Sequence, residues 1–211
     1  CDFALPLAGV TGPDFVLISN GDGTDLEDPL DRYVLTNDFY MMTTEVTQGM
    51  FAELMGYDSR DGESSHYGDG ANHPAYWVSW HMAADFANAL SALEGFEECY
   101  SCTGSETSVI CTENTEASSI YECSGYRLPT EAEWELAARS GSTSEFWTGE
   151  GEELGGTYSS STSAGTETIV DGAGNPLIGD YAWYSGNLLD DEGNARCKQV
   201  AQLLPNGNGL Y

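Results

Sequence analysis

The sequence predicts an irregular, loop-rich α+β domain that is held together by disulfide bonds. The 211 residues include 25 glycines and a surplus of serine and threonine, a composition typical of domains with long loops rather than of helical bundles. Few segments have the alternation of long strands, whereas three segments carry helix start and stop signals. Four of the six cysteines cluster between Cys99 and Cys123, which indicates covalent staples in a segment that lacks a core.

Charge and composition exclude several classes of partner. The 35 acidic and 6 basic side chains give a net charge of −29 at pH 7, so nucleic acid and anionic lipid surfaces would be repelled. Aromatic residues make up 11% of the chain, which argues against a disordered acidic tail. No apolar run approaches the roughly 20 residues that span a bilayer. We therefore expect a folded domain that neither binds nucleic acid nor crosses a membrane.

Two strands are expected in the first part of the chain. Residues 1–13 are an apolar lead-in with proline and glycine, and the domain proper spans 14–211. Asp14–Ser19 and Arg32–Tyr40 have strand-like character, and the acidic segment 21–31 between them has the composition of a loop.

The first two expected helices have clear caps. Thr47 begins one helix and Gly56 ends it, while Ser79 and Gly95 bound the other. Apolar residues recur at helical spacing on one side of each helix. These residues are Met50, Phe51, Leu54 and Met55 in the first helix, and Trp80, Ala83, Ala84, Ala87 and Leu90 in the second.

A third helix is predicted by the capping box of Thr130 and Glu133, with Gly141 as its stop. Its buried side is expected to carry Trp134, Ala137 and Ala138. Residues 142–180 then form a long loop with a short hairpin near 168–176, followed by the aromatic patch 181–184.

The segment 97–124 is expected to be stapled by two disulfides. The Cys99-x2-Cys102 spacing also suits a pair of zinc ligands, but eleven residues separate Cys111 from Cys123, which disfavours a four-cysteine zinc site. Of the three possible pairings, we favour the nested one, Cys99–Cys123 and Cys102–Cys111. It closes a small hairpin over residues 105–110 inside a larger loop. Disulfides of this kind indicate an oxidising compartment.

The remaining cysteines, Cys1 and Cys197, have two interpretations. In the first they form a disulfide, which the even count of cysteines favours. In the second, Cys1 is the lipidated first residue of a mature bacterial lipoprotein, so that the lipid attaches the domain to a membrane. Both interpretations place the protein outside the cytoplasm, in the periplasm, at the cell surface or in the extracellular space.

Residues 125–139, GYRLPTEAEWELAAR, closely resemble the signature of the formylglycine-generating enzyme family, also called the sulfatase-modifying factor domain. Other motifs of the family are present before and after this segment, in the order that the family has them. They are 44–48 with Phe51, His73-Pro74, Val78-Ser79-Trp80, 182–187 and 205–211. The resemblance runs from about Asp14 to Tyr211, with a cysteine-bearing insertion at 97–124. It implies the irregular α+β fold that is related to C-type lectins.

The motif residues are expected to have structural roles. Thr130 and Glu133 would satisfy N-terminal donors of the third helix, and Trp80 and Trp134 would lie in the core. Arg127 and Arg139 are expected to pair with carboxylates. For Arg127 we favour this role over a substrate clamp, because the surrounding residues are helix-start signals.

Catalysis by the family requires two copper-binding cysteines that lie beyond the motif at 205–211. None of the six cysteines here aligns with that pair, and the sequence given stops at Tyr211. This leaves three alternatives: either the polypeptide continues beyond Tyr211, or another chain completes the core, or the chain is a diverged form of the family.

Two functions therefore stay open. One is an exported, non-catalytic binding or structural module of the cell surface or of an extracellular assembly, with a protein, a glycan or further copies of itself as partner. The other is a formylglycine-generating oxidase that acts on sulfatase cysteines and is seen without its copper-binding segment. The missing cysteine pair favours the module.

Calcium is the remaining cofactor to consider. The resemblance implies a calcium ion near the asparagine of the 182–187 motif, where Asn187, Leu188, Asp190 and Asp191 offer hard oxygen ligands. An acidic, solvated turn explains the same residues equally well. The spacing of the three histidines, at positions 66, 73 and 81, disfavours a histidine metal site.

Overall fold

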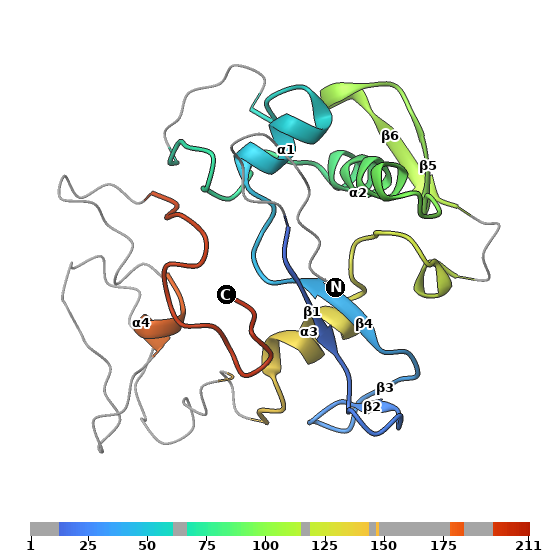
Figure 1. Ribbon diagram of the computed structural model, residues 1–211, viewed down its shortest axis with the longest axis vertical. Helices are drawn as coiled ribbons and strands as arrows, with labels where there is room; N and C mark the ends of the chain where they lie inside the picture. The colour runs from blue at the N-terminus through green and yellow to red at the C-terminus, as the bar shows by residue number, and fades with distance from the viewer. Residues whose placement is uncertain (1–12, 61–66, 115–118, 144–146, 148–177, 184–195) are drawn as a thin grey trace. The chain divides into compact units, whose positions relative to one another are not determined.

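The computed structural model describes residues 13–60, 67–114, 119–143, 147, 178–183 and 196–211. The described helices are α1 (Gln48–Met55), α2 (Trp80–Glu94), α3 (Glu131–Arg139) and the short α4 (Ile178–Tyr181) (Figure 1). The described strands form two-stranded antiparallel sheets that pair β1 with β4, β2 with β3 and β5 with β6. The predicted loop-rich α+β class is confirmed. The chain divides into two compact units, one with Asp14–Thr44 and Glu131–Tyr211 and the other with Glu45–Thr130.

The strands of the first unit differ from the prediction at two points: a short strand lies within the expected loop 21–31, and the expected strand 32–40 is divided in two. β1 (Phe15–Ile18) pairs with β4 (Phe39–Met42), and β2 (Leu26–Glu27) pairs with β3 (Val34–Leu35). The single strand expected over 32–40 is therefore wrong, because the chain bends at Asn37 and continues as a separate strand. Asn37 and Asp38 are turn-forming residues, and they interrupt the strand pattern.

Helix α3 has the predicted bounds but a different buried face. It begins at Glu131, directly after Thr130, and Gly141 follows its end with φ of 83°. The buried residues are Glu133, Leu136 and Ala137, whereas Trp134 is 61% exposed. The expectation of a core Trp134 is wrong, because burial of Glu133 sets the phase of the helix. With about 100° between successive residues, Trp134 falls outside the buried face.

The motif at 205–211 ties the end of this unit to α3. The Asn206 amide donates to the carbonyls of Ala137 at 2.9 Å and Ala138 at 3.2 Å, and its Oδ1 accepts from the backbone N–H groups of Asn208 and Leu210 at 3.0 Å. Asn206 is itself buried. A side chain that satisfies four backbone groups in this way has a structural role.

In the second unit the caps of α1 and α2 are confirmed. Thr47 accepts the N–H of Met50 at 3.2 Å, and Ser79 accepts that of Met82 at 3.1 Å. Gly56 and Gly95 end the two helices in the left-handed conformation, where glycine carries no steric penalty.

The core of this unit forms where α1 packs against α2. The rings of Phe51 and Phe86 stack with their centroids 5.8 Å apart, and Ala84 and Leu90 of α2 are buried as well. Trp80 is 47% exposed, so its expected core position is wrong. It lies at the first residue of α2, and its ring contacts the edge of Tyr100 at 5.5 Å instead.

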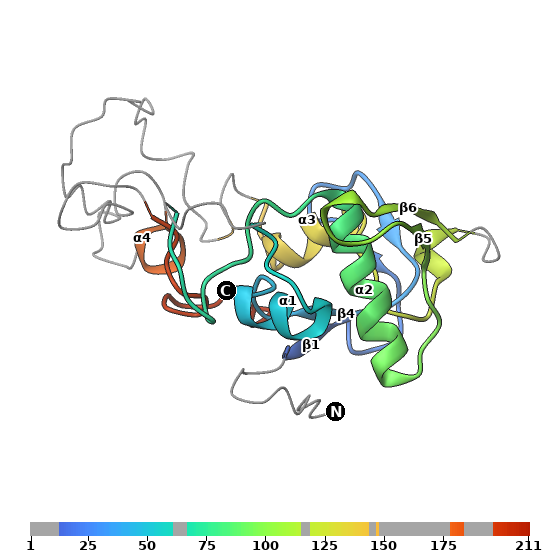
Figure 2. The same cartoon turned by 90° about the horizontal axis from the view of Figure 1, so that it is seen from above.

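The cysteine-rich insertion forms a hairpin of β5 (Tyr100–Thr103) and β6 (Ile110–Glu113) that packs on α2 (Figures 1 and 2). Both predicted disulfides, Cys99–Cys123 and Cys102–Cys111, are present. Cys102 and Cys111 face each other directly across the two strands, so the smaller loop is the predicted hairpin. Within the described part of the chain, none of the helices has both the length and the apolar character needed to span a membrane.

Candidate functional site

Several predicted site residues fall outside the described residues. The calcium ligands Asn187, Leu188, Asp190 and Asp191 belong to this group, as do Cys1, His66 and the hairpin near 168–176. The calcium site therefore stays a prediction.

Cys197 bears on the predicted disulfide with Cys1. It is half-buried and has a free thiol in the structure. Because Cys1 lies outside the described residues, the Cys1–Cys197 disulfide stays a prediction.

The predicted carboxylate pairing of Arg139 is confirmed. Its guanidinium contacts Glu135 at 2.9 Å, and Glu135 also holds Arg32 at 2.9 Å. Arg32 contacts the buried Asp28 at 2.6 Å, and this bond lowers the pKa of Asp28 to about 2. Sequence reasoning missed Asp28 and Arg32, because an i, i+4 spacing indicates an ion pair on a helix, whereas these residues lie in the connection between β2 and β3.

Arg127 forms hydrogen bonds with the backbone. It donates to the carbonyls of Leu128 at 3.2 Å and Tyr121 at 3.4 Å, and its guanidinium lies 5.8 Å from the centre of the Tyr121 ring. These contacts agree with a structural role, while its pairing with a carboxylate stays a prediction.

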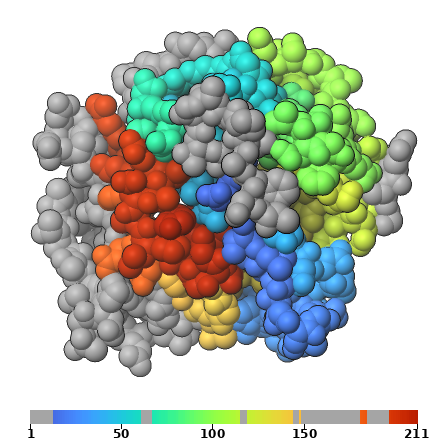
Figure 3. All heavy atoms as spheres, viewed as in Figure 1, coloured from blue at the N-terminus to red at the C-terminus, as the bar shows by residue number. Residues whose placement is uncertain are grey.

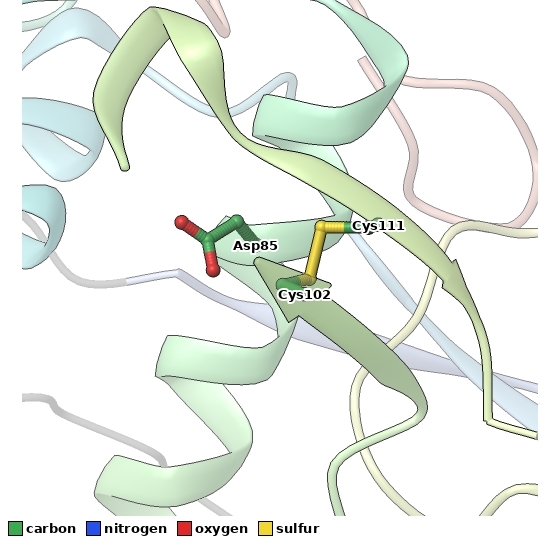
Figure 4. A group of neighbouring side chains, drawn as sticks. All are labelled: Asp85, Cys102 and Cys111. Atoms are coloured by element: carbon green, nitrogen blue, oxygen red, sulfur yellow. A yellow bond between two sulfur atoms is a disulfide. The ribbon is translucent and has the colours of Figure 1, made fainter. Parts of the chain in front are cut away.

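The described residues contain one cluster with metal-ligand chemistry, formed by Asp85, Cys102 and Cys111 (Figure 4). The two sulfur atoms are bonded to each other, so in this oxidised state they are not thiolate ligands. His81 lies next to this cluster, and its Nδ1 accepts the backbone N–H of Cys111 at 3.1 Å.

The most exposed aromatic group of the second unit lies on the loop before α2. We call Tyr67, Tyr76 and Trp77 the aromatic surface. Tyr67 is 50% exposed and Trp77 is 53% exposed. The ring of Tyr76 meets both edge-on, with centroids 5.7 Å from Tyr67 and 6.4 Å from Trp77. Residues 67–79 are teal in Figure 1, and Figure 3 shows teal atoms at the molecular surface.

The loop that carries these rings is held by Gln48, the first residue of α1. Its side-chain amide donates to the carbonyls of Gly68 and Pro74, both at 3.2 Å, and accepts the N–H of Gly70 at 3.2 Å. The Gln48 backbone N–H donates to the carbonyl of His73 at 2.8 Å. Because one helix end bonds four backbone groups of the loop, the loop that carries the rings is held in one conformation, which pre-organises the rings.

Trp77 has an unusual backbone conformation with φ of 60°. A bulky residue in the left-handed region is a true outlier, and this conformation costs about 1–3 kcal/mol. Its neighbour is fixed by the hydroxyl of the buried Ser59, which donates to the carbonyl of Tyr76 at 2.9 Å. Such strain persists only where the surroundings impose it, and it is found at functional sites.

Charged groups border the aromatic surface. Arg60 contacts Asp58 at 2.5 Å and Asp69 at 2.9 Å, and its guanidinium lies 5.8 Å from the centre of the Tyr76 ring. The bond to Arg60 lowers the pKa of Asp58, so this carboxylate accepts hydrogen bonds at neutral pH rather than donating a proton.

This arrangement of aromatic rings, one guanidinium and acceptor carboxylates suits non-covalent recognition. Sequence reasoning missed the site. The only available signal was the adjacent Tyr76 and Trp77 before a capped helix, and the sequence does not reveal the backbone conformation that exposes Trp77.

Comparison with known proteins agrees with the motifs. The family described as sulfatase-modifying factor enzyme 1-like domain matches residues 6–211. The chain is 30% identical over 207 residues to the protein named chaperone protein LppX from Paenibacillus barcinonensis, covering 94% of this chain and 67% of that protein.

Two solved structures are similar to this chain. Treponema denticola variable protein 1 has a TM-score of 0.59 at 21% identity, with 96% of this chain and 70% of that chain covered. CarF has a TM-score of 0.50 at 26% identity, with 95% and 76% covered. The likeness to variable protein 1 shows a common fold.

Proposed function

The chain belongs to the sulfatase-modifying factor enzyme 1-like family, and from this premise we propose that it is an exported, non-catalytic module that binds a protein partner. The observation that carries the proposal is the aromatic surface, where Gln48 and Ser59 hold the loop on which the exposed Trp77 has a positive φ. Strain at an exposed tryptophan has no benefit for stability, so a binding role accounts for it best.

The chemistry of the aromatic surface favours a protein over other ligands. Tryptophan, tyrosine and arginine are the residues enriched at binding hot spots between proteins. The aromatic surface exposes Trp77 and Tyr67, and the guanidinium of Arg60 lies beside its Tyr76 ring. A relative named as a chaperone protein supports the same class of partner.

The cysteines support export and a non-catalytic role. Cys99 and Cys111 are almost fully buried, at 1% and 2% exposure, and each belongs to a disulfide of the hairpin segment. Such disulfides form and persist in oxidising compartments. The described cysteines of the insertion thus serve as staples, and we propose a periplasmic, cell-surface or extracellular location.

Site-specific photo-crosslinking on the producing cells tests the proposal. A photoreactive phenylalanine analogue replaces Trp77 in one variant and Tyr40 in a control variant. Tyr40 is a 62% exposed aromatic residue of the other unit. We expect a discrete protein adduct at position 77 that is absent at position 40 and is suppressed by an excess of unlabelled wild-type protein. Adducts only with glycan, only with a second copy, or equally at both positions would overturn the proposal.

The second candidate function is the formylglycine-generating oxidase, which family membership favours. Incubation of the full-length protein in air with copper, a thiol reductant and a peptide that carries a sulfatase cysteine separates the two. The proposed module leaves the cysteine unchanged by mass spectrometry, whereas conversion to formylglycine would establish the oxidase.

A further inference from the structure

Beyond the proposed binding role, and independently of it, we propose that reduction of the Cys102–Cys111 disulfide converts these cysteines and Asp85 into a Zn²⁺ site. The oxidised hairpin cannot bind the ion, so the site depends on the redox state.

The donor atoms are already grouped. The carboxylate of Asp85 and the two sulfurs lie within 4.8 Å of one another, and Figure 4 shows the carboxyl group of α2 beside the disulfide of the hairpin. In a tetrahedral site with Zn–S near 2.3 Å and Zn–O near 2.0–2.2 Å, donor atoms are separated by about 3.5–3.8 Å. Once the disulfide is broken, side-chain rotations must move the two sulfurs apart to reach this geometry. Three protein ligands leave a fourth position for water.

The side of α2 that faces the hairpin carries polar residues, although packing alone would need apolar ones. His81, Asp85 and Asn88 follow one another at i, i+4 and i+7, so they share one helix face. The Nδ2 of Asn88 lies 3.7 Å from the sulfur of Cys102, and the sulfur of Cys111 lies 3.3 Å from the carbonyl oxygen of His81. The released sulfurs therefore have polar neighbours in place.

Asn88 is itself fixed in position. Its Nδ2 donates to the carbonyl of Tyr100 at 2.7 Å, and its Oδ1 accepts the Tyr100 N–H at 3.1 Å. A fixed donor beside a sulfur stabilises the thiolate form that binds metal, and such outer partners typically change metal affinity by 10–100-fold.

The two disulfides differ in the length of chain that they close. Each joins a half-buried cysteine, Cys102 or Cys123, to an almost fully buried one, Cys111 or Cys99. The Cys102–Cys111 bond closes a separation of 9 residues against 24 for Cys99–Cys123. A shorter loop restricts the unfolded chain less, so loss of this bond leaves more of the fold intact.

Reduction of the disulfide precedes metal binding. A dithiol attacks the Cys102–Cys111 bond and supplies two electrons and two protons, which yields two thiols and the cyclic disulfide of the reductant. Zn²⁺ then displaces both thiol protons and takes the ionised carboxylate of Asp85 as its third ligand.

The test uses Co²⁺ as a spectroscopic probe that Zn²⁺ displaces. The full chain is reduced with a dithiol, freed of reductant without oxygen, and titrated. The wild type and a C99S/C123S control are each expected to bind one Co²⁺ with thiolate charge-transfer absorption, but only after reduction. C102S/C111S should lose this absorption. D85N, which keeps both cysteines, should bind at least about ten-fold more weakly.

Four outcomes would overturn the proposal: no thiolate absorption in reduced wild type, equal binding by the oxidised protein, binding retained in C102S/C111S, or wild-type affinity in D85N. Circular dichroism of each reduced variant checks the fold. If C102S/C111S does not fold, the comparison of D85N with reduced wild type decides the question by itself.

Discussion

The ion pair between Asp28 and Arg32 makes a measurable contribution to stability through the charge of a buried carboxylate. Asp28 is 4% exposed, and its contact with Arg32 lowers its pKa from 3.8 to about 2. A difference of about 1.8 units corresponds to roughly 2.4 kcal/mol at 1.36 kcal/mol per unit. Because the side chain of Arg32 is 41% exposed, solvent screening reduces this value, and we expect about 1 kcal/mol for Asp28→Asn at pH 7.

The sign of the pH dependence follows from the lowered pKa. A carboxyl with a lowered pKa in the folded state stabilises the protein above its unfolded pKa and loses this effect as pH falls through its folded pKa. The wild-type advantage over Asp28→Asn should therefore be complete above about pH 5 and vanish between about pH 4 and pH 2. Urea unfolding followed by tryptophan fluorescence measures both free energies of unfolding across this range.

Glu27→Gln is the matched control, because it removes one exposed carboxylate from the same hairpin. In a chain with a net charge of −29, loss of an exposed carboxylate is expected to be neutral or stabilising. The reasoning is refuted if Asp28→Asn is as stable as Glu27→Gln at pH 7, or if its deficit is unchanged at pH 2.

Three further predictions concern the core, the strained tryptophan and calcium. Phe51→Ala should lower the free energy of unfolding by about 3–5 kcal/mol, because Phe51 is 2% exposed. The control Phe96→Ala, at a 44% exposed position, should change the free energy of unfolding by less than about 1 kcal/mol. Equal effects of the two substitutions would contradict the described core. Trp77→Asn should leave the melting temperature unchanged or raised, since asparagine tolerates positive φ; a clear fall would mean that Trp77 is structural. If Asn187 and Asp191 hold calcium, a chelator should lower the melting temperature and Asp191→Ala should abolish that effect, whereas an unchanged melt in chelator would leave the solvated turn.

Local signals in the sequence were sufficient to predict the helix ends and the insertion. Thr47 and Ser79 cap their helices through bonds to residues three positions away, and a cap depends on little beyond its own turn. The nested disulfides were predictable for a similar reason, because Cys102 and Cys111 lie close in the chain.

The positions of the large aromatic side chains were not predictable. Burial of Trp134 depends on which face of α3 turns inward, and that face is set by the buried Glu133. Trp80 lies at a helix end, where spacing alone does not distinguish a core side chain from an exposed one. The candidate site depends on the positive φ of Trp77, which tertiary hydrogen bonds from other segments impose.

The most direct test of the binding role is the affinity between the Trp77→Asn variant and the partner captured at position 77. Calorimetry with purified components measures this affinity. A hot-spot tryptophan contributes at least about 2 kcal/mol, so we expect the dissociation constant to rise about 30-fold or more. Tyr40→Asn, at an exposed aromatic position of the other unit, should bind like the wild type. Wild-type affinity in Trp77→Asn would contradict the role of the aromatic surface.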